Sequence, residues 1–148
     1  MAHTYPLTLT WTGSTLDTPY ARQALVETAG KPAIPVSSAP EYAGDPSRWN
    51  PEDLLGSALA TCHMLTFLAL CAKARVEVRG YEDHAEAVLD TVDKVTRITE
   101  VHLRPVIRVP RGTSQAKVVE LFEKAHKYCF VANSVTCRAV MAPRVVEI

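Results

Sequence analysis

Residues 50–74, which read NPEDLLGSALATCHMLTFLALCAKA, decide the fold of this chain. Asn50 can cap a helix, and Pro51 suits the first helical position because that position needs no N–H donor. The acids that follow, Glu52 first, favour the positive end of the helix dipole. The sequence therefore predicts a helix that begins at Pro51 and runs to about Ala74.

This helix is unusually apolar. From Leu54 to Ala72 about nineteen residues carry no formal charge, which by length alone would suffice to cross a bilayer. Small and polar residues interrupt the run, however, its flanks lack aromatic belts, and nothing else in the chain resembles a membrane segment. We therefore expect no membrane partner, and a central helix buried on nearly all sides.

The composition is that of an ordinary soluble protein, with 148 residues, 47% of them hydrophobic, and 16 Lys+Arg against 16 Asp+Glu. We predict a single domain over residues 1–148. No basic excess or cluster is present, so nucleic acid is not expected as a partner. The N-terminal stretch MAHTYPLTLTW does not resemble a secretory signal, which predicts a cytoplasmic protein.

Two extended segments precede the helix. Apolar and polar residues alternate from Tyr5 to Thr12, the pattern of a half-buried strand. A second run, from about Tyr20 to Thr28, could pair back on the first as a hairpin. The turn-rich residues 35–48 are expected to pass over the surface as an ordered loop.

Extended segments also follow the helix, from about Tyr81 to Leu89 and from Arg97 to Val109. Their pattern predicts a hairpin with one face exposed to solvent. Pro105 has no N–H to donate, which places its strand at an edge or in a bulge. Residues 138–148 are expected to form the last strand.

A second helix is predicted after Ser114, which can cap it. Val118, Phe122, Ala125 and Cys129 then recur at helical spacing on one face. With strands, a central helix, strands, a helix and a strand in that order, the chain is predicted to be an α+β protein.

Cys62 lies in the middle of the first helix, and Cys129 follows the second. Each alone is explained by packing, because free cysteine is commonly a small core residue. If the two helices pack together the cysteines could face each other, and a disulfide needs only about 5 to 6 Å between Cα atoms. Without a CxxC or histidines at ligand spacing, we expect no metal site.

Two blocks of sequence resemble the OsmC/Ohr family, named for osmotically inducible protein C and organic hydroperoxide resistance protein. Residues 50–62, NPEDLLGSALATC, are similar to the family helix that carries a peroxidatic cysteine. Residues 125–131, AHKYCFV, are similar to the segment that holds its resolving cysteine. The resemblance implies an OsmC-like fold, with antiparallel sheets wrapped around two central helices, and an intertwined homodimer whose sites draw on both chains.

The resemblance also implies roles for individual residues. Cys62 would attack the peroxide, Cys129 would trap the resulting sulfenic acid as a disulfide, and an arginine held by Glu52 would stabilise the thiolate. Arg22 is our choice for that arginine, with Arg48 as the alternative; either could instead be a solvated surface residue. Glu52 could equally serve only the helix dipole. Met64, Phe67 and Tyr42 are candidate apolar walls of the pocket.

Several positions depart from the family pattern. Tyr128 and Phe130 flank Cys129, where the family usually has Gly and Pro. His63 points about 100° away from Cys62 on the helix, so we expect it to meet a polar neighbour in the core rather than to serve as a base. Cys71 falls on the opposite helix face and is expected to be structural. Neither Cys71 nor Cys137 matches a catalytic position.

The resemblance implies a cysteine-based peroxidase that reduces organic hydroperoxides, and hydrogen peroxide less well, in oxidative-stress defence. A dithiol, with a lipoyl-type donor as one candidate, would reset the enzyme, and no metal or organic cofactor is required. The alternative is a redox sensor or small-apolar-ligand-binding protein on the same scaffold, which does not turn over. A third reading is a structural domain with four inert core thiols.

Overall fold

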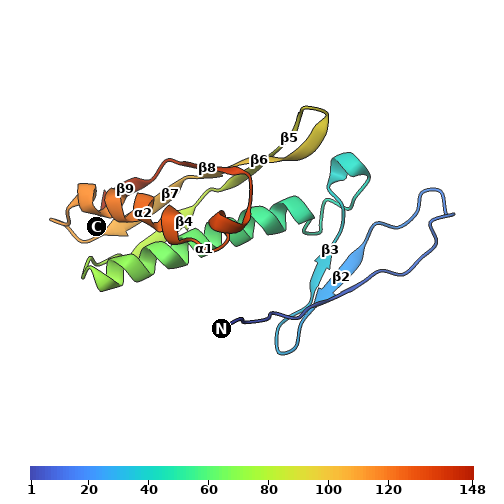
Figure 1. Ribbon diagram of the computed structural model, residues 1–148, viewed down its shortest axis with the longest axis horizontal. Helices are drawn as coiled ribbons and strands as arrows, with labels where there is room; N and C mark the ends of the chain where they lie inside the picture. Colours follow the sequence, from blue (N-terminus) through green and yellow to red (C-terminus); the bar gives the residue numbers. More distant parts are fainter. The chain divides into compact units, whose positions relative to one another are not determined.

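The computed structural model describes residues 1–148, which divide into two compact units, Met1–Leu54 and Leu55–Ile148 (Figure 1). Helix α1, Pro51–Lys73, begins at the end of the first unit and continues into the second. The predicted cap is confirmed. The N–H of Asp53 donates to Oδ1 of Asn50 at 2.8 Å, and the N–H of Asn50 donates back to the Asp53 carboxylate at 3.2 Å. This reciprocal pair satisfies donors that the first helical turn leaves free.

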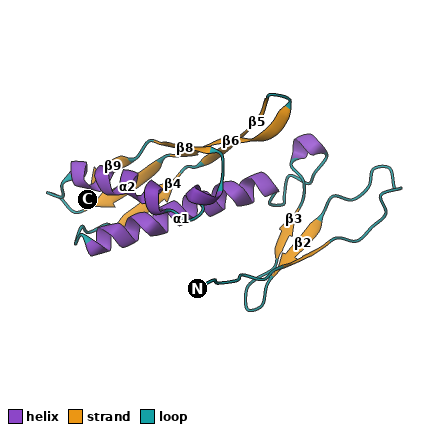
Figure 2. Ribbon diagram, viewed as in Figure 1, coloured by secondary structure: helices purple, strands orange, loops and turns teal.

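The first unit is a small antiparallel sheet with a loop and a short 3-10 helix (Figure 2). Its strands run in the order β1-β2-β3, with bounds β1 Thr8–Thr10, β2 Ala24–Glu27 and β3 Ile34–Val36. The predicted hairpin of the first two strands is confirmed.

Two expectations about this unit need correction. Strand β1 is exposed along its whole length rather than half-buried, because within this unit no second layer covers either face. The loop over residues 35–48 is not wholly at the surface: it contains the 3-10 helix Pro40–Tyr42, and both Ser37 and Ala39 are buried. Ser37 accepts a hydrogen bond from the N–H of Asp45 at 3.0 Å, which closes the loop on itself.

The second unit has two three-stranded sheets. The first, in the order β4-β7-β9, consists of Gly80–Asp83, Pro105–Val109 and Arg144–Glu147. The second, in the order β5-β6-β8, consists of Glu86–Val92, Val95–Leu103 and Arg138–Met141. Strands β8 and β9 run parallel to their neighbours, and the other pairs are antiparallel.

The predicted hairpin after α1 is confirmed as β5 and β6, joined through Asp93 and Lys94, which both have positive φ. The single strand predicted over residues 97–109 is wrong. The chain changes sheets at Arg104, whose N–H donates to the Asp83 carboxylate at 2.7 Å. Pro105 therefore begins a central strand instead of lying at an edge or in a bulge, and a first position suits a residue without an N–H. The predicted last strand is likewise two strands, β8 and β9.

Helix α2, Gln115–Tyr128, packs beside α1 on the strands of the second unit (Figure 1). Ser114 caps it as predicted, accepting from the N–H of Lys117 at 3.3 Å. Its predicted apolar face is completely buried. The core joins both helices to strands β6 and β7, through Leu59, Phe67, Cys71, Val101, Leu103, Ile107, Val109, Val118, Leu121, Phe122 and Ala125.

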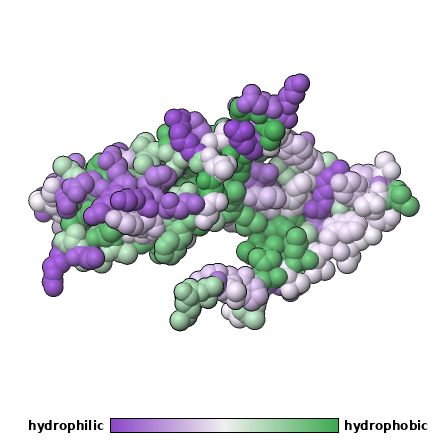
Figure 3. All heavy atoms as spheres, viewed as in Figure 1, coloured by the Kyte–Doolittle hydropathy of each residue, from purple (hydrophilic) through white to green (hydrophobic).

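Helix α1 is long and apolar enough to span a membrane by length and composition, but only 28% of its most apolar window is buried. The expectation of burial on nearly all sides is therefore wrong. One stripe faces inward, and Leu65 on the outer side is 57% exposed. Hydrophobic side chains thus reach the surface along the helix (Figure 3). The buried stripe is Gly56, Leu59, His63, Phe67 and Cys71.

Candidate functional site

Cys62 and Cys129 come together where the middle of α1 meets the end of α2. Cys62 is half-buried, Cys129 is completely buried, and both are free thiols. The contact of the Cys129 thiol with the Cys62 sulfur helps to lower the pKa of Cys62 and to raise that of Cys129. The facing arrangement expected from the helix positions is therefore present, and it joins the more accessible sulfur to a sheltered one.

The surroundings of Cys62 favour its ionised form. Burial raises the pKa of a thiol, but at Cys62 this effect is outweighed by hydrogen bonds from the backbone N–H of Val131, the Cys129 thiol and the backbone N–H of Phe130. The pKa of Cys62 consequently lies below its ordinary value. The hydroxyl of Thr66 also lies nearby, but it donates its proton to the Cys62 carbonyl at 2.8 Å, so we assign it little of this effect.

Cys129 is affected in the opposite direction. Burial raises the pKa of its thiol, and the neighbouring Cys62 raises it further. The N–H of Ala132, which donates to the Cys129 sulfur at 3.4 Å, offsets only part of this increase. Cys62 is therefore the first of the two to lose its proton, and Cys129 keeps its own.

The backbone donors around the two sulfurs were not foreseen from the sequence. Phe130, Val131 and Ala132 contribute main-chain N–H groups, which every residue except proline possesses, so their side chains give no signal. Phe130 itself turns its ring outward and is 83% exposed. The sequence shows only that residue 130 is not a proline, which would have no N–H to donate at that position.

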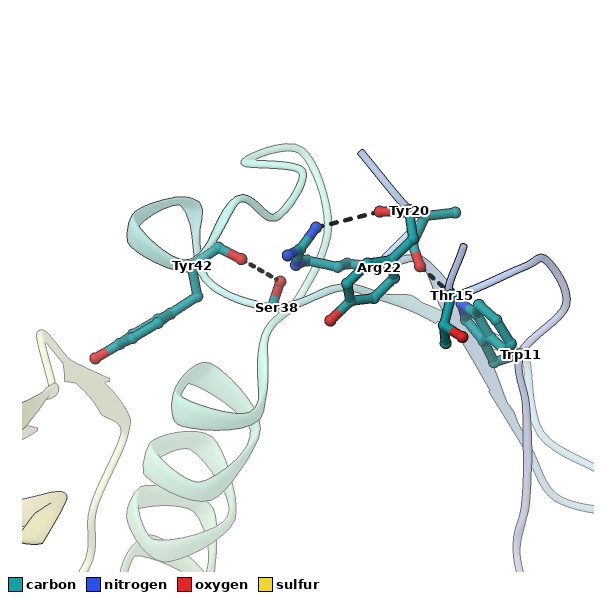
Figure 4. A pocket seen from close by; sticks show the side chains of 7 residues that line it. Trp11, Thr15, Tyr20, Arg22, Ser38 and Tyr42 are labelled. Carbon is teal, nitrogen blue, oxygen red and sulfur yellow. Dashed lines mark hydrogen bonds between the residues drawn. The ribbon is translucent and has the colours of Figure 1, made fainter. Parts of the chain in front are cut away.

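Arg22 lies in a pocket of about 510 Å³ within the first unit (Figure 4). Its guanidinium sits 4.1 Å from the centre of the Tyr20 ring and donates to the Tyr20 carbonyl at 3.1 Å. Figure 4 shows the side chain extending away from Trp11 toward Ser38. Tyr42, expected as a pocket wall, lines the same cavity. The pocket thus combines aromatic walls with one cation that has no carboxylate partner within 4.0 Å.

Glu52 has not formed the expected contact with an arginine. One of its carboxylate oxygens is buried without a hydrogen-bond partner. Arg48 instead forms an ion pair with Asp45 at 3.7 Å and donates a hydrogen bond to the Ala24 carbonyl at 3.4 Å. Its guanidinium therefore already has partners within the first unit. Of the two candidate arginines, Arg22 is the one that forms no ion pair with a carboxylate.

His63 corrects an expectation. It is completely buried, yet neither ring nitrogen has a hydrogen-bond partner, so the polar neighbour predicted for it is not a bonded one. Its ring lies 4.4 Å from that of Phe122 and 6.4 Å from that of His126 between centroids. Burial, reinforced by His126, lowers the pKa of His63 to about 4, so the side chain is neutral near pH 7.

The remaining residues considered from the sequence lie outside the cysteine pair. Cys71 is buried as expected, and burial raises the pKa of its thiol to about 11. Phe67 is a core residue rather than an accessible wall, whereas Met64 is half-buried. Cys137 is partly buried against the core. No cluster of three or more His, Cys, Asp or Glu side chains suitable for a metal ion is present.

Comparisons with known proteins identify the family and the fold of this chain. Residues 44–142 match the model of the OsmC-like protein family. An OsmC-like protein of unknown function from Vibrio cholerae has 29% sequence identity and a TM-score of 0.86, covering 96% of this chain and 99% of its own. An organic hydroperoxide resistance protein from Elizabethkingia anophelis has 19% identity and a TM-score of 0.71, with both chains covered completely.

A curated relative, the uncharacterized protein YmaD of Bacillus subtilis, is 23% identical over 103 residues, which cover 68% of this chain and 69% of YmaD. The family match spans well over half of the sequence, and the Vibrio cholerae structure shares the α+β architecture along nearly the whole chain. The chain belongs to the OsmC family.

Proposed function

We propose that this protein is a thiol-dependent peroxidase that reduces organic hydroperoxides, and hydrogen peroxide less well, in oxidative-stress defence. The observation that carries the proposal is the difference between the two cysteines that lie in contact. Cys62 is half-buried and its pKa is lowered, whereas Cys129 is buried and its pKa is raised. A peroxidase needs a thiolate for the attack and a second thiol that still has its proton. Structural neighbours named as organic hydroperoxide resistance proteins support the same reading.

In the first step the Cys62 thiolate attacks the terminal oxygen of the hydroperoxide. The O–O bond breaks, the alcohol leaves with the hydroperoxide proton, and Cys62 becomes a sulfenate that takes up a proton from water. In the second step the Cys129 sulfur attacks the Cys62 sulfenic acid, so that a disulfide forms and water leaves. A dithiol donor, for which a lipoyl-type compound is a candidate, then reduces the disulfide and is itself oxidised to a disulfide.

Arg22 and Glu52 have supporting roles in this proposal. Arg22 would stabilise the Cys62 thiolate and orient the peroxide, which suits a guanidinium lying in an aromatic pocket without a carboxylate partner. Glu52 would hold that arginine, which would give its buried, unpartnered oxygen a donor. The aromatic lining of the Arg22 pocket favours an organic over an inorganic peroxide.

The assembly is also part of the proposal. We propose a single OsmC-like domain over residues 1–148 that acts in the cytoplasm as an intertwined homodimer. The apolar residues that α1 leaves exposed, with Leu65 among them, support burial against a second chain. If the dimer completes the site, a dilute monomeric form should lose peroxidase turnover.

The test is steady-state consumption of tert-butyl hydroperoxide with a lipoyl-type or simple dithiol as donor. Wild-type protein should turn over, Cys62→Ser should be inactive, and Cys71→Ser should behave like wild type because Cys71 lies on the opposite side of α1. Oxidation of wild-type protein once, without further consumption, would replace the proposal with a redox sensor. No oxidation of any cysteine would leave a binding protein or a structural domain.

A further inference from the structure

The segment that follows α2 surrounds both sulfurs with main-chain donors. Helix α2 ends at Tyr128, and Cys129 is its C-cap in an extended conformation. The chain then turns back, so that the N–H of Ala132 donates to the Cys129 sulfur at 3.4 Å. The N–H groups of Phe130 and Val131 lower the pKa of the Cys62 thiol by hydrogen bonding to it. We call residues 130–132 the amide cradle.

The amide cradle is fixed mainly by Asn133. The side-chain amide nitrogen of Asn133 donates to the Lys127 carbonyl at 3.0 Å and to the Cys129 carbonyl at 2.9 Å. The backbone N–H of Asn133 donates to the same Cys129 carbonyl at 3.1 Å. Three hydrogen bonds from one residue therefore join the far side of the cradle to the last turn of α2.

These bonds meet a general need of helix ends. The last four carbonyls of an α-helix have no partner within the helix and must find donors elsewhere. Only a side-chain amide provides two N–H donors on so short a stem without adding a charge. A hydrophobic side chain at this position would leave the Lys127 carbonyl to water and would release one of the two donors to Cys129.

Two further bonds, both from Ser134, close the cradle from the other direction. The hydroxyl of Ser134 donates to the Phe130 carbonyl at 2.7 Å, and its N–H donates to the Val131 carbonyl at 2.9 Å. Phe130 turns its ring into solvent, so its side chain cannot anchor the loop by packing. Polar contacts therefore hold the cradle at both ends: Asn133 makes three bonds to the carbonyls of Lys127 and Cys129, and Ser134 makes two to the carbonyls of Phe130 and Val131.

We propose that Asn133 is a positioning residue of the redox pair, which holds the amide cradle so that its N–H groups stabilise the Cys62 thiolate. This inference rests on the proposed function for its importance in turnover. Its physical content, the effect of Asn133 on the ionisation of Cys62, does not depend on a peroxide. A side chain that touches neither sulfur would in this way set the reactivity of one of them.

The experiment is alkylation of reduced protein by iodoacetamide between pH 5 and 9, with the Cys62 peptide quantified by mass spectrometry. In Asn133→Leu the pH midpoint of Cys62 alkylation should rise, and the rate at pH 6 should fall about tenfold if one pKa unit is lost. Asn133→Ala should behave in the same way. Thr136→Ala, an exposed position outside the cradle, should match wild type.

Several outcomes would overturn the inference. One is an unchanged midpoint in both Asn133 variants while their circular dichroism stays native, and another is an equal change in Thr136→Ala. A variant that does not fold is replaced by Ser134→Ala, which should raise the midpoint by less. Because alkylation needs no peroxide, a raised midpoint in a protein without peroxidase turnover would uphold the role of Asn133 and refute the proposed function alone.

Discussion

Cys129 lies against the sulfur of Cys62, and the contact between the two thiols shifts their pKa values in opposite directions. This contact helps to lower the pKa of Cys62 and, added to burial, raises the pKa of Cys129. Two cysteines in equivalent surroundings would compete to become the nucleophile. Here the more accessible sulfur is also the more acidic one, and the buried sulfur retains its proton.

Removing this contact should therefore change Cys62 directly. A hydrogen bond to a charged group contributes about 1.5–3 kcal/mol, so Cys129→Ala should raise the pKa of Cys62 by about one unit or more. Cys129→Ser keeps an O–H donor and should raise it less. The pH dependence of Cys62 alkylation measures both, and a lower pKa in Cys129→Ala would contradict the effect assigned to this contact.

The two arginines can be separated by substitution. Arg22→Gln should lower kcat/KM for an organic hydroperoxide by about 10²-fold or more, the usual loss on removal of one donor to developing charge. Arg48→Gln should have a much smaller effect, because Arg48 already contacts Asp45 and the Ala24 carbonyl. Stopped-flow peroxide oxidation checks both variants. The reverse order of effects would assign the cation to Arg48.

His63 should make the protein sensitive to acid. Its pKa in the folded state is about 4, below the ordinary 6.5, so the unfolded chain binds more protons between these values. The stabilisation is complete above pH 6.5 and is lost as the pH falls toward 4, by up to about 3 kcal/mol. Urea unfolding at several pH values measures this loss.

The control for this prediction removes the titrating ring. His63→Leu should flatten the decline in the free energy of unfolding between pH 6.5 and 4, whereas His3→Leu, at an exposed position, should leave the decline unchanged. An equally steep decline in His63→Leu would mean that another group causes the acid sensitivity.

The core prediction compares two leucines. Leu59 is completely buried between α1 and its neighbours, and Leu16 is 91% exposed. Leu59→Ala should lower the free energy of unfolding by about 2–5 kcal/mol, through lost burial and the remaining cavity. Leu16→Ala should change it by less than about 0.5 kcal/mol. Chemical denaturation measures both, and similar losses would refute the assigned core.

The parts of the fold that depend on neighbouring residues could be predicted from the sequence. Asn50 and Ser114 begin their helices because each cap needs only a side chain and N–H groups two or three residues away. The β5–β6 hairpin is likewise local. The break at Arg104 could not be predicted, because it depends on which distant strands β6 and β7 pair with. The exposure of Leu65 also depends on what packs against α1, which periodicity cannot show.

The candidate site divides in the same way. The meeting of Cys62 with Cys129 could be inferred because Cys62 lies on α1, Cys129 directly follows α2, and the two helices are long enough to pack together. The amide cradle could not, since main-chain donors carry no sequence signal. His63 was expected to find a polar partner, but its packing against Phe122 leaves both ring nitrogens without one. Which hydrogen-bond partners a buried side chain finds depends on how its neighbours pack, and residue type alone does not determine that.

The central claim, that Cys62 and Cys129 act as one redox pair, is tested most directly by a single oxidation. Fully reduced protein would be treated with one equivalent of tert-butyl hydroperoxide, its remaining thiols alkylated, and its peptides mapped by mass spectrometry. The account predicts a disulfide between Cys62 and Cys129, with Cys71 and Cys137 still reduced. Oxidation at Cys71 or Cys137 instead, or a Cys62 sulfenic acid that never engages Cys129, would contradict it.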